Sequence, residues 1–101
     1  MRTLVIERDV FAESVCCSDD SMTVRFDDGR SLSVPLAWYP RLLHGTTKER
    51  EQYALIGNGE GIHWPELDED VSVDGLLAGQ RSAESDASLA RWLERRQSAS
   101  N

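Results

Sequence analysis

The sequence has no long apolar run. No window of its 101 residues approaches the roughly 18–20 consecutive apolar residues that a membrane-spanning helix needs. Near the N-terminus, the short apolar run Leu4–Ile6 is followed directly by Glu7, so the apolar core of a signal peptide is not expected there. We therefore expect a cytoplasmic protein that has no membrane partner.

Cysteine is scarce as well. The two cysteines, Cys16 and Cys17, are neighbours in the chain, and a disulfide bond between adjacent residues would close a small, strained ring. In a strand, their side chains point to opposite faces of the sheet. The pair therefore predicts one buried and one partly exposed thiol, which we favour over a redox or metal role.

Basic residues are outnumbered by acidic ones. The chain has 11 Lys and Arg residues against 18 Asp and Glu residues, which gives a net charge of −7. Recognition of nucleic acid needs clustered basic side chains that neutralise phosphates, so we expect no direct binding of DNA or RNA. The acidity suits a soluble cytosolic protein, a basic protein partner or a mimic of nucleic acid.

Common catalytic motifs are also missing. The sequence contains no nucleophile elbow, paired Cys-x-x-Cys motif, Walker loop or calcium-binding loop. The glycine-rich stretch Gly57–Gly61 follows a predicted helix, whereas a phosphate-binding loop joins a strand to a helix. We therefore nominate no catalytic residue, no cofactor and no metal.

What is present indicates one small α+β domain. A chain of this length has room for a single core, and its 40% hydrophobic content is typical of globular domains. The large side chains Trp38, Trp64 and Trp92 are therefore core candidates.

Short β-prone runs predict a small antiparallel sheet. The runs cover residues 14–17, 22–26 and 32–36, and Asp28-Gly29 between the last two favours a hairpin. Apolar residues alternate with polar ones in these runs, so one face of the sheet is expected to be buried. Residues 3–11 are expected to add a fourth strand to this meander.

Short helices are expected after the sheet. Pro40 suits the first turn of a helical segment over residues 38–43. Thr46 and Glu49 have the spacing of a capping box, which predicts a helix over residues 47–55. The further expected elements are a strand over 61–64 that returns to the sheet, a helix over 73–78 capped by Ser72, and a C-terminal helix over 86–97. We place the α+β domain in residues 1–79, and a linker and amphipathic helix in residues 80–101.

The C-terminal helix carries a candidate interaction face. Leu89, Trp92, Leu93 and Arg96 fall at helical spacing. A helix of about twelve residues is only marginally stable alone in water, so Trp92 is expected to be buried. Either the chain's own domain or another protein chain can cover this face. We favour another chain, because a tryptophan on an adaptable arm is a typical interface anchor.

A second candidate region is the acidic loop that follows a histidine. His63 and Trp64 precede the carboxylates Asp68 and Asp70, and Arg41 lies earlier in the chain. A histidine oriented by a carboxylate can act as a general base or a metal ligand. We favour a structural loop, in which Trp64 is a core anchor and Arg41 pairs with the acids.

Four blocks of sequence resemble a known family. They are residues 28–30, 34–42, 61–70 and 75–79, and together they resemble Domain of Unknown Function 2442 (DUF2442), whose fold type is the N-terminal domain of a small Nitrosomonas protein. The resemblance implies a small bacterial α+β domain. Some members are fused to a helix-turn-helix, and others are encoded beside a second small protein in arrangements that suggest toxin and antitoxin.

Charge and resemblance together suggest a function. We expect a non-catalytic protein-interaction module of antitoxin-like character that masks a basic, toxin-like protein, with self-association as a further possibility. The alternative is a small enzyme, or a metal- or ligand-binding protein, that uses His63 with Asp68 or Asp70.

Overall fold

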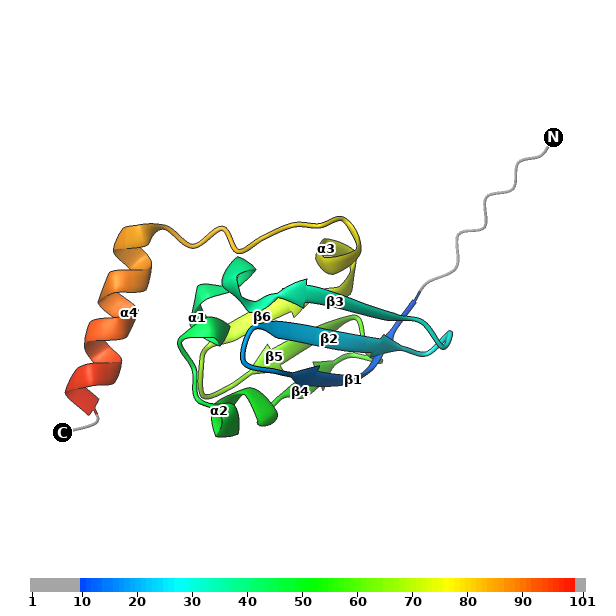
Figure 1. The fold of residues 1–101 in the computed structure, drawn as a ribbon, viewed down its shortest axis with the longest axis horizontal. Helices are drawn as coiled ribbons and strands as arrows, with labels where there is room; N and C mark the ends of the chain where they lie inside the picture. Colours follow the sequence, from blue (N-terminus) through cyan, green and yellow to red (C-terminus); the bar gives the residue numbers. More distant parts are fainter. Residues whose placement is uncertain (1–9, 100–101) are drawn as a thin grey trace.

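Two small antiparallel sheets form the body of the protein (Figure 1). The computed structural model describes residues 10–99. The first sheet has the order β1-β2-β3, with bounds Ala12–Cys17, Ser21–Phe26 and Ser31–Pro35. The second has the order β4-β5-β6, with bounds Ala54–Ile56, Gly61–Trp64 and Glu69–Ser72. The α+β class is therefore confirmed, and the expected fourth strand over residues 3–11 lies almost wholly outside the described residues.

The first sheet is the predicted meander. Met22, Val24 and Phe26 alternate with more exposed residues along β2, and each is at most 2% exposed. The β2–β3 hairpin turns at Gly29, whose φ of 93° lies in the left-handed region that glycine adopts without steric cost. Alternation and turn chemistry were thus sufficient to predict this half of the fold.

The helix predicted over residues 47–55 is wrong in its second half. The capping box at Thr46 and Glu49 is present, but α2 spans only Thr47–Glu51, and the chain then forms β4. β4 pairs with β5 in the register Leu55↔Ile62. The glycine-rich stretch at Gly57 is therefore a hairpin turn between two strands and not the end of a helix.

The acidic loop also contains a strand that was not predicted. Residues Glu69–Ser72 form β6, which pairs with β5 in the register Trp64↔Glu69 and Ile62↔Val71. Consequently Gly61–Trp64 does not return to the first sheet but is the central strand of the second. Acidic residues have low strand propensity, and here pairing with β5 overrides that preference.

The remaining elements are helical. A 3-10 turn over Leu36–Trp38 leads into α1 at Pro40–Leu43, in place of the single segment expected over residues 38–43. α3 spans Val73–Leu77, with the Ser72 side chain accepting from the Gly75 amide, and α4 spans Asp86–Ala99. In the described part of the chain, no helix combines the length and apolar character that crossing a membrane requires.

One core joins the two sheets. Trp64 and Trp92 are 0% and 5% exposed and belong to the same cluster of buried apolar residues. Trp38 is only partly buried at the edge of this cluster, so its assignment as a core residue is corrected. The guanidinium of Arg81 lies over its ring, 4.8 Å from the centroid.

A buried arginine holds the turn between α1 and α2. Arg50 donates to the backbone carbonyls of Leu42 and Gly45, at 3.0 and 2.6 Å. The indole of Trp64 in turn donates to the Arg50 carbonyl at 3.1 Å. These bonds satisfy backbone oxygens and an indole N–H that would otherwise be costly to bury, and they place α1 and α2 against β5.

Candidate functional site

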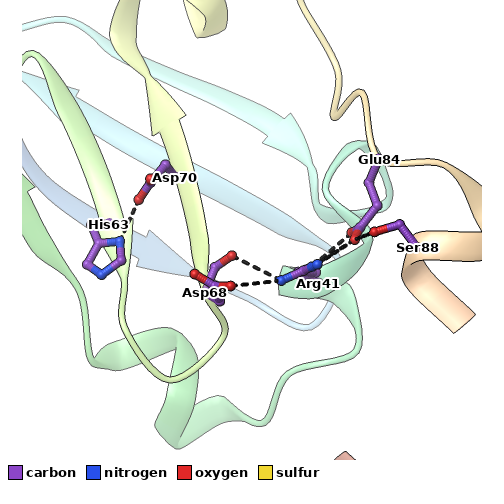
Figure 2. A network of polar contacts seen from close by, with 6 residues as sticks. All are labelled: Arg41, His63, Asp68, Asp70, Glu84 and Ser88. Atoms are coloured by element: carbon purple, nitrogen blue, oxygen red, sulfur yellow. Dashed lines mark hydrogen bonds and ion pairs between the residues drawn. The ribbon is translucent and has the colours of Figure 1, made fainter. Parts of the chain in front are cut away.

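The five residues of the candidate loop do not form one site. Figure 2 shows His63 with Asp70 in one contact and Arg41 with Asp68 in another. Trp64 lies in the core, as expected. The sequence therefore predicted both the loop's link to Arg41 and its core anchor, but the region divides into two separate polar contacts.

Arg41 is the centre of the larger network. Its Nη1 donates to the backbone carbonyl of Asp68 at 3.2 Å and lies 3.5 Å from the Asp68 carboxylate. Its stronger partner is Glu84, whose carboxylate accepts from Nε and Nη2 at distances down to 2.6 Å. Glu84 also accepts from the Ser88 hydroxyl at 2.8 Å. Arg41 thereby ties α1 to the β5–β6 turn and to the start of α4 (Figure 2).

The segment that leads into α4 is also fixed to the domain. We call residues 78–85 the connecting segment. The Tyr39 hydroxyl donates to the carbonyl of Gln80, and the Ser82 amide donates to the carbonyl of Trp38, both at 2.9 Å. Together with the Arg41–Glu84 pair, these bonds replace the free linker that the polar sequence suggested.

α4 lies at one end of the body, beside α1 and α2 (Figure 1). Trp92 is 5% exposed within the single chain, and the guanidinium groups of Arg41 and Arg96 lie 5.1 and 4.7 Å from its ring. Leu89 and Leu93 pack partly against the same core. The expectation that Trp92 is buried is confirmed, whereas the preference for another chain as its cover is wrong, because the chain's own domain covers it.

A second ion pair fixes the far end of α4. Arg96 donates to both carboxylate oxygens of Glu49 on α2, at 2.8 and 3.0 Å. The hydrogen bond from Arg96 holds the pKa of Glu49 below its ordinary value, as the bond from Arg41 does for the pKa of Glu84. The glutamate that completes the capping box of α2 thus also anchors α4.

The His63–Asp70 contact joins neighbouring positions on β5 and β6. The His63 Nδ1 lies 2.5 Å from an Asp70 carboxylate oxygen, and both side chains are substantially exposed, at 39% and 69%. Across residues 10–99, no cluster of three His, Cys, Asp or Glu side chains has the arrangement that could hold a metal ion. The contact is a cross-strand polar pair.

Glu69 is a residue that the sequence reasoning did not single out. It lies opposite Trp64 and two residues before buried Val71, so the alternation of the strand places it on the side of β6 that faces the core. No hydrogen bond to its carboxylate is found among the described residues. Burial, opposed by Arg41 and reinforced by nearby acids, raises the pKa of Glu69 to about 7.

Glu69 borders a cavity of about 470 Å³ between β6, the connecting segment and the start of α4. Its lining includes four acidic and two basic residues, which are Asp68, Glu69, Asp70, Glu84, Arg41 and Arg81. His63 does not line it. Arg41 is paired with Glu84 within the wall of the cavity. The other charged lining residues are the acidic Asp68, Glu69 and Asp70 and the basic Arg81.

Two solved structures share this fold. One is a protein of unknown function from Rhodospirillum rubrum, with 24% identity and a TM-score of 0.66, matching 76% of this chain and 95% of that chain. The other is an uncharacterized protein from Chromobacterium violaceum, with 23% identity and a TM-score of 0.63, matching 80% of this chain and 74% of that chain. At these identities the likeness extends to the fold alone. A comparison with curated proteins found no match.

The family match covers the part of the chain that forms the two sheets. The family model described as "Protein of unknown function (DUF2442)" matches residues 12–82. That range includes both sheets and the helices α1 to α3, and it ends before α4 begins. It also contains Arg41 and Glu49, the two residues of the domain to which the α4 region is bound. The chain therefore belongs to the DUF2442 family.

Proposed function

We propose that this protein is a non-catalytic interaction module, antitoxin-like in character, that binds a basic partner protein through the face formed by β6 and the connecting segment. The observation that carries the proposal is the gathering of Asp68, Glu69, Asp70 and Glu84 around one cavity. Only Glu84 among them is neutralised by a close, bidentate arginine contact.

Electrostatic complementarity supports this choice of partner. With a net charge of −7, the protein attracts basic surfaces and repels phosphate-rich ones. Opposed charges at an interface increase the association rate and discriminate between partners more than they add affinity. A cavity with more acidic than basic lining residues offers such a partner a place to insert a side chain.

The experiment is affinity capture from the source organism with two triple variants of equal charge. One variant, Asp68→Asn, Glu69→Gln and Asp70→Asn, neutralises the proposed face. The control, Asp19→Asn, Glu51→Gln and Glu94→Gln, neutralises three exposed acids elsewhere. We expect one basic protein to be captured by the wild type and by the control but not by the face variant, and to be released by salt.

Two results contradict the proposal. One is a captured partner that both variants retain equally, which places the interface elsewhere. The other is a captured partner that is itself acidic, because complementarity then has no role. Catalytic turnover by the purified protein alone would exclude a module that acts only by binding.

A further inference from the structure

The hydrogen bonds of Arg50 use only part of its guanidinium group. In the described part of the chain it is the one charged residue that is buried, at 9% exposed. Its Nη1 donates to the carbonyls of Leu42 and Gly45. The other three N–H groups belong to Nε and Nη2, and among residues 10–99 no acceptor for them is found. Buried donors without an acceptor cost folding free energy.

The charge of Arg50 is also without a counter-charge. Arg41 binds Glu84 through Nε and Nη2, and Arg96 binds Glu49 through Nη1 and Nη2. Both of these arginines are only partly buried. Within residues 10–99, Arg50 forms no ion pair. The most deeply buried arginine of the described chain is therefore one that lacks a carboxylate, although burial of an unpaired charge is unfavourable.

A small cavity lies against Arg50 where β1 and α2 meet (Figure 1). Its volume is about 100 Å³, and its lining residues are Val15, Cys16, Cys17, Thr47, Arg50 and Glu51. Val15, Cys17 and Arg50 are partly or fully buried, whereas the other three are exposed. The cavity thus reaches from the surface to the guanidinium, and it shares no lining residue with the larger cavity beside β6.

The lining does not itself supply the missing negative charge. Burial raises the pKa of the Cys17 thiol, although the nearby Arg50 lowers it, so the thiol is neutral at neutral pH. The carboxylate of Glu51 is exposed and forms no ion pair with Arg50. An anion from solution is the remaining source of a counter-charge.

The unused edge of the guanidinium determines the kind of anion. Nε–H and one Nη2–H form a fork that matches two oxygens of a single group, and Arg41 uses the same two atoms to bind Glu84. The cavity has about the volume that three water molecules occupy in the liquid. That space suits an ion with three or four oxygens and excludes a nucleotide or a peptide.

We propose that the cavity between β1 and α2 binds a small inorganic oxyanion, for which inorganic phosphate is the probe, through Nε and Nη2 of Arg50 and the hydroxyl of Thr47. The net charge of −7 opposes this binding over long distances and is screened by salt, whereas the hydrogen bonds of Arg50 act locally. Because the backbone of Arg50 also accepts from Trp64, the anion strengthens the contact of α2 with both sheets. This site is independent of the proposed function.

The test is an NMR titration of the full chain with sodium phosphate, and with sodium chloride at the same ionic strength. We expect saturable shifts of the amide signals of Val15, Cys17 and Thr47 with phosphate alone. Arg50→Lys keeps the charge and a donor for the turn but lacks the fork, so it should lose these shifts. Arg25→Lys is the matched control and should retain them, because the Arg25 side chain is 64% exposed and lies outside the cavity.

A second measurement does not depend on the folding of Arg50→Lys. In a Cys16→Ser background, phosphate should slow the alkylation of Cys17 by iodoacetamide in a saturable way. The bound ion covers the thiol and neutralises the Arg50 charge that lowers the pKa of Cys17. Sodium chloride at the same ionic strength should leave the alkylation rate unchanged.

Several results would overturn the inference. They are an absence of saturable shifts with phosphate, shifts of equal size in Arg50→Lys, or equal protection of Cys17 by chloride. Tighter binding of acetate than of phosphate would assign the guanidinium fork to a carboxylate group and would also contradict an inorganic oxyanion.

Discussion

The guanidinium of Arg41 and the carboxylate of Glu84 are separated by 43 positions in the sequence and approach to 2.6 Å. Their side chains are only 12% and 10% exposed, so the pair is shielded from solvent far more than an ordinary surface ion pair. Removing one partner therefore leaves a poorly solvated charge.

We expect Glu84→Gln to lower the free energy of unfolding by about 2 kcal/mol, because hydrogen bonds to charged groups are lost. Chemical denaturation measures this change. Asp28→Asn is the control, since it weakens the Arg30–Asp28 pair, in which Arg30 is 68% exposed, and a surface pair contributes little. An equal loss in both variants would show that Arg41–Glu84 behaves as a surface pair.

Ionisation of the partly buried glutamates should change the stability of the fold with pH in two opposite directions. The pKa of Glu84 and of Glu49 is lowered in the fold by Arg41 and Arg96, so their stabilisation is present above the unfolded pKa and is lost as pH falls through the folded one. The pKa of Glu69 is raised to about 7, so its contribution is greatest below its unfolded pKa and is lost as pH rises through about 7.

The alkaline part of this profile is attributable to Glu69. Thermal melts from pH 5 to pH 8 should show a decline for the wild type that is smaller in Glu69→Gln, so that the variant becomes the more stable protein at pH 8. Parallel profiles for the two proteins would mean that Glu69 titrates in the fold as it does in the unfolded chain.

Two tryptophans should differ in their contribution to stability. Trp64 is fully buried and donates to the Arg50 carbonyl, so Trp64→Ala should cost about 3–5 kcal/mol. Trp38 is partly exposed, and Trp38→Ala should cost clearly less. Urea denaturation of the two variants compares them, and equal losses would contradict the burial described above.

The contact between the two sheets at Gly59 can be tested with two glycines. Both Gly59 and Gly29 have positive φ values, 104° and 93°, but a Cβ on Gly59 would lie 2.4 Å from the Ala12 carbonyl oxygen, whereas one on Gly29 meets nothing within 4 Å. Gly59→Ala should therefore lower the melting temperature more than Gly29→Ala, which reports backbone strain alone. Equal losses would show that the approach of β1 to the β4–β5 turn is adaptable.

The structure also revises the expected effect of removing α4. Because Trp92 is buried by the chain's own domain, deletion of residues 83–101 should lower the melting temperature of a monomeric protein. Trp92→Ala alone should cost about 3–5 kcal/mol. Differential scanning calorimetry measures the deletion, and light scattering confirms that the parent is a monomer. An unchanged melting temperature would restore the idea of an independent arm.

The part of the fold that sequence reasoning could predict was the part coded locally. Alternation along Met22–Phe26 and the Asp28-Gly29 turn specify the first sheet without reference to anything distant. In the second sheet, β4 has three exposed residues and β6 begins with two acids. Neither segment has a strand pattern of its own, and each becomes a strand through pairing with β5.

The candidate site likewise combines contacts that local sequence predicts with contacts that depend on distant packing. The pairing of Arg41 with the acidic region was predictable from charge alone, whereas its bond to Glu84 has no local signal. Glu69 could have been found only after β6 was identified, because its inward position follows from the strand's two-residue period. Long-range packing thus determines which of several neighbouring acids points inward and has a raised pKa.

The bonds that fix the connecting segment have a consequence for competition at the α4 surface. The Ser82 amide and the Glu84 carboxylate are bound to the domain and α4 begins at Asp86, so the tether to α4 is very short. A short tether maintains a ligand at an effective concentration in the millimolar range or above. A separate helix displaces α4 from the surface around Arg41 and Glu49 only when its concentration, divided by its own dissociation constant, exceeds the same ratio for the tethered α4. This protects the surface from weak, nonspecific ligands.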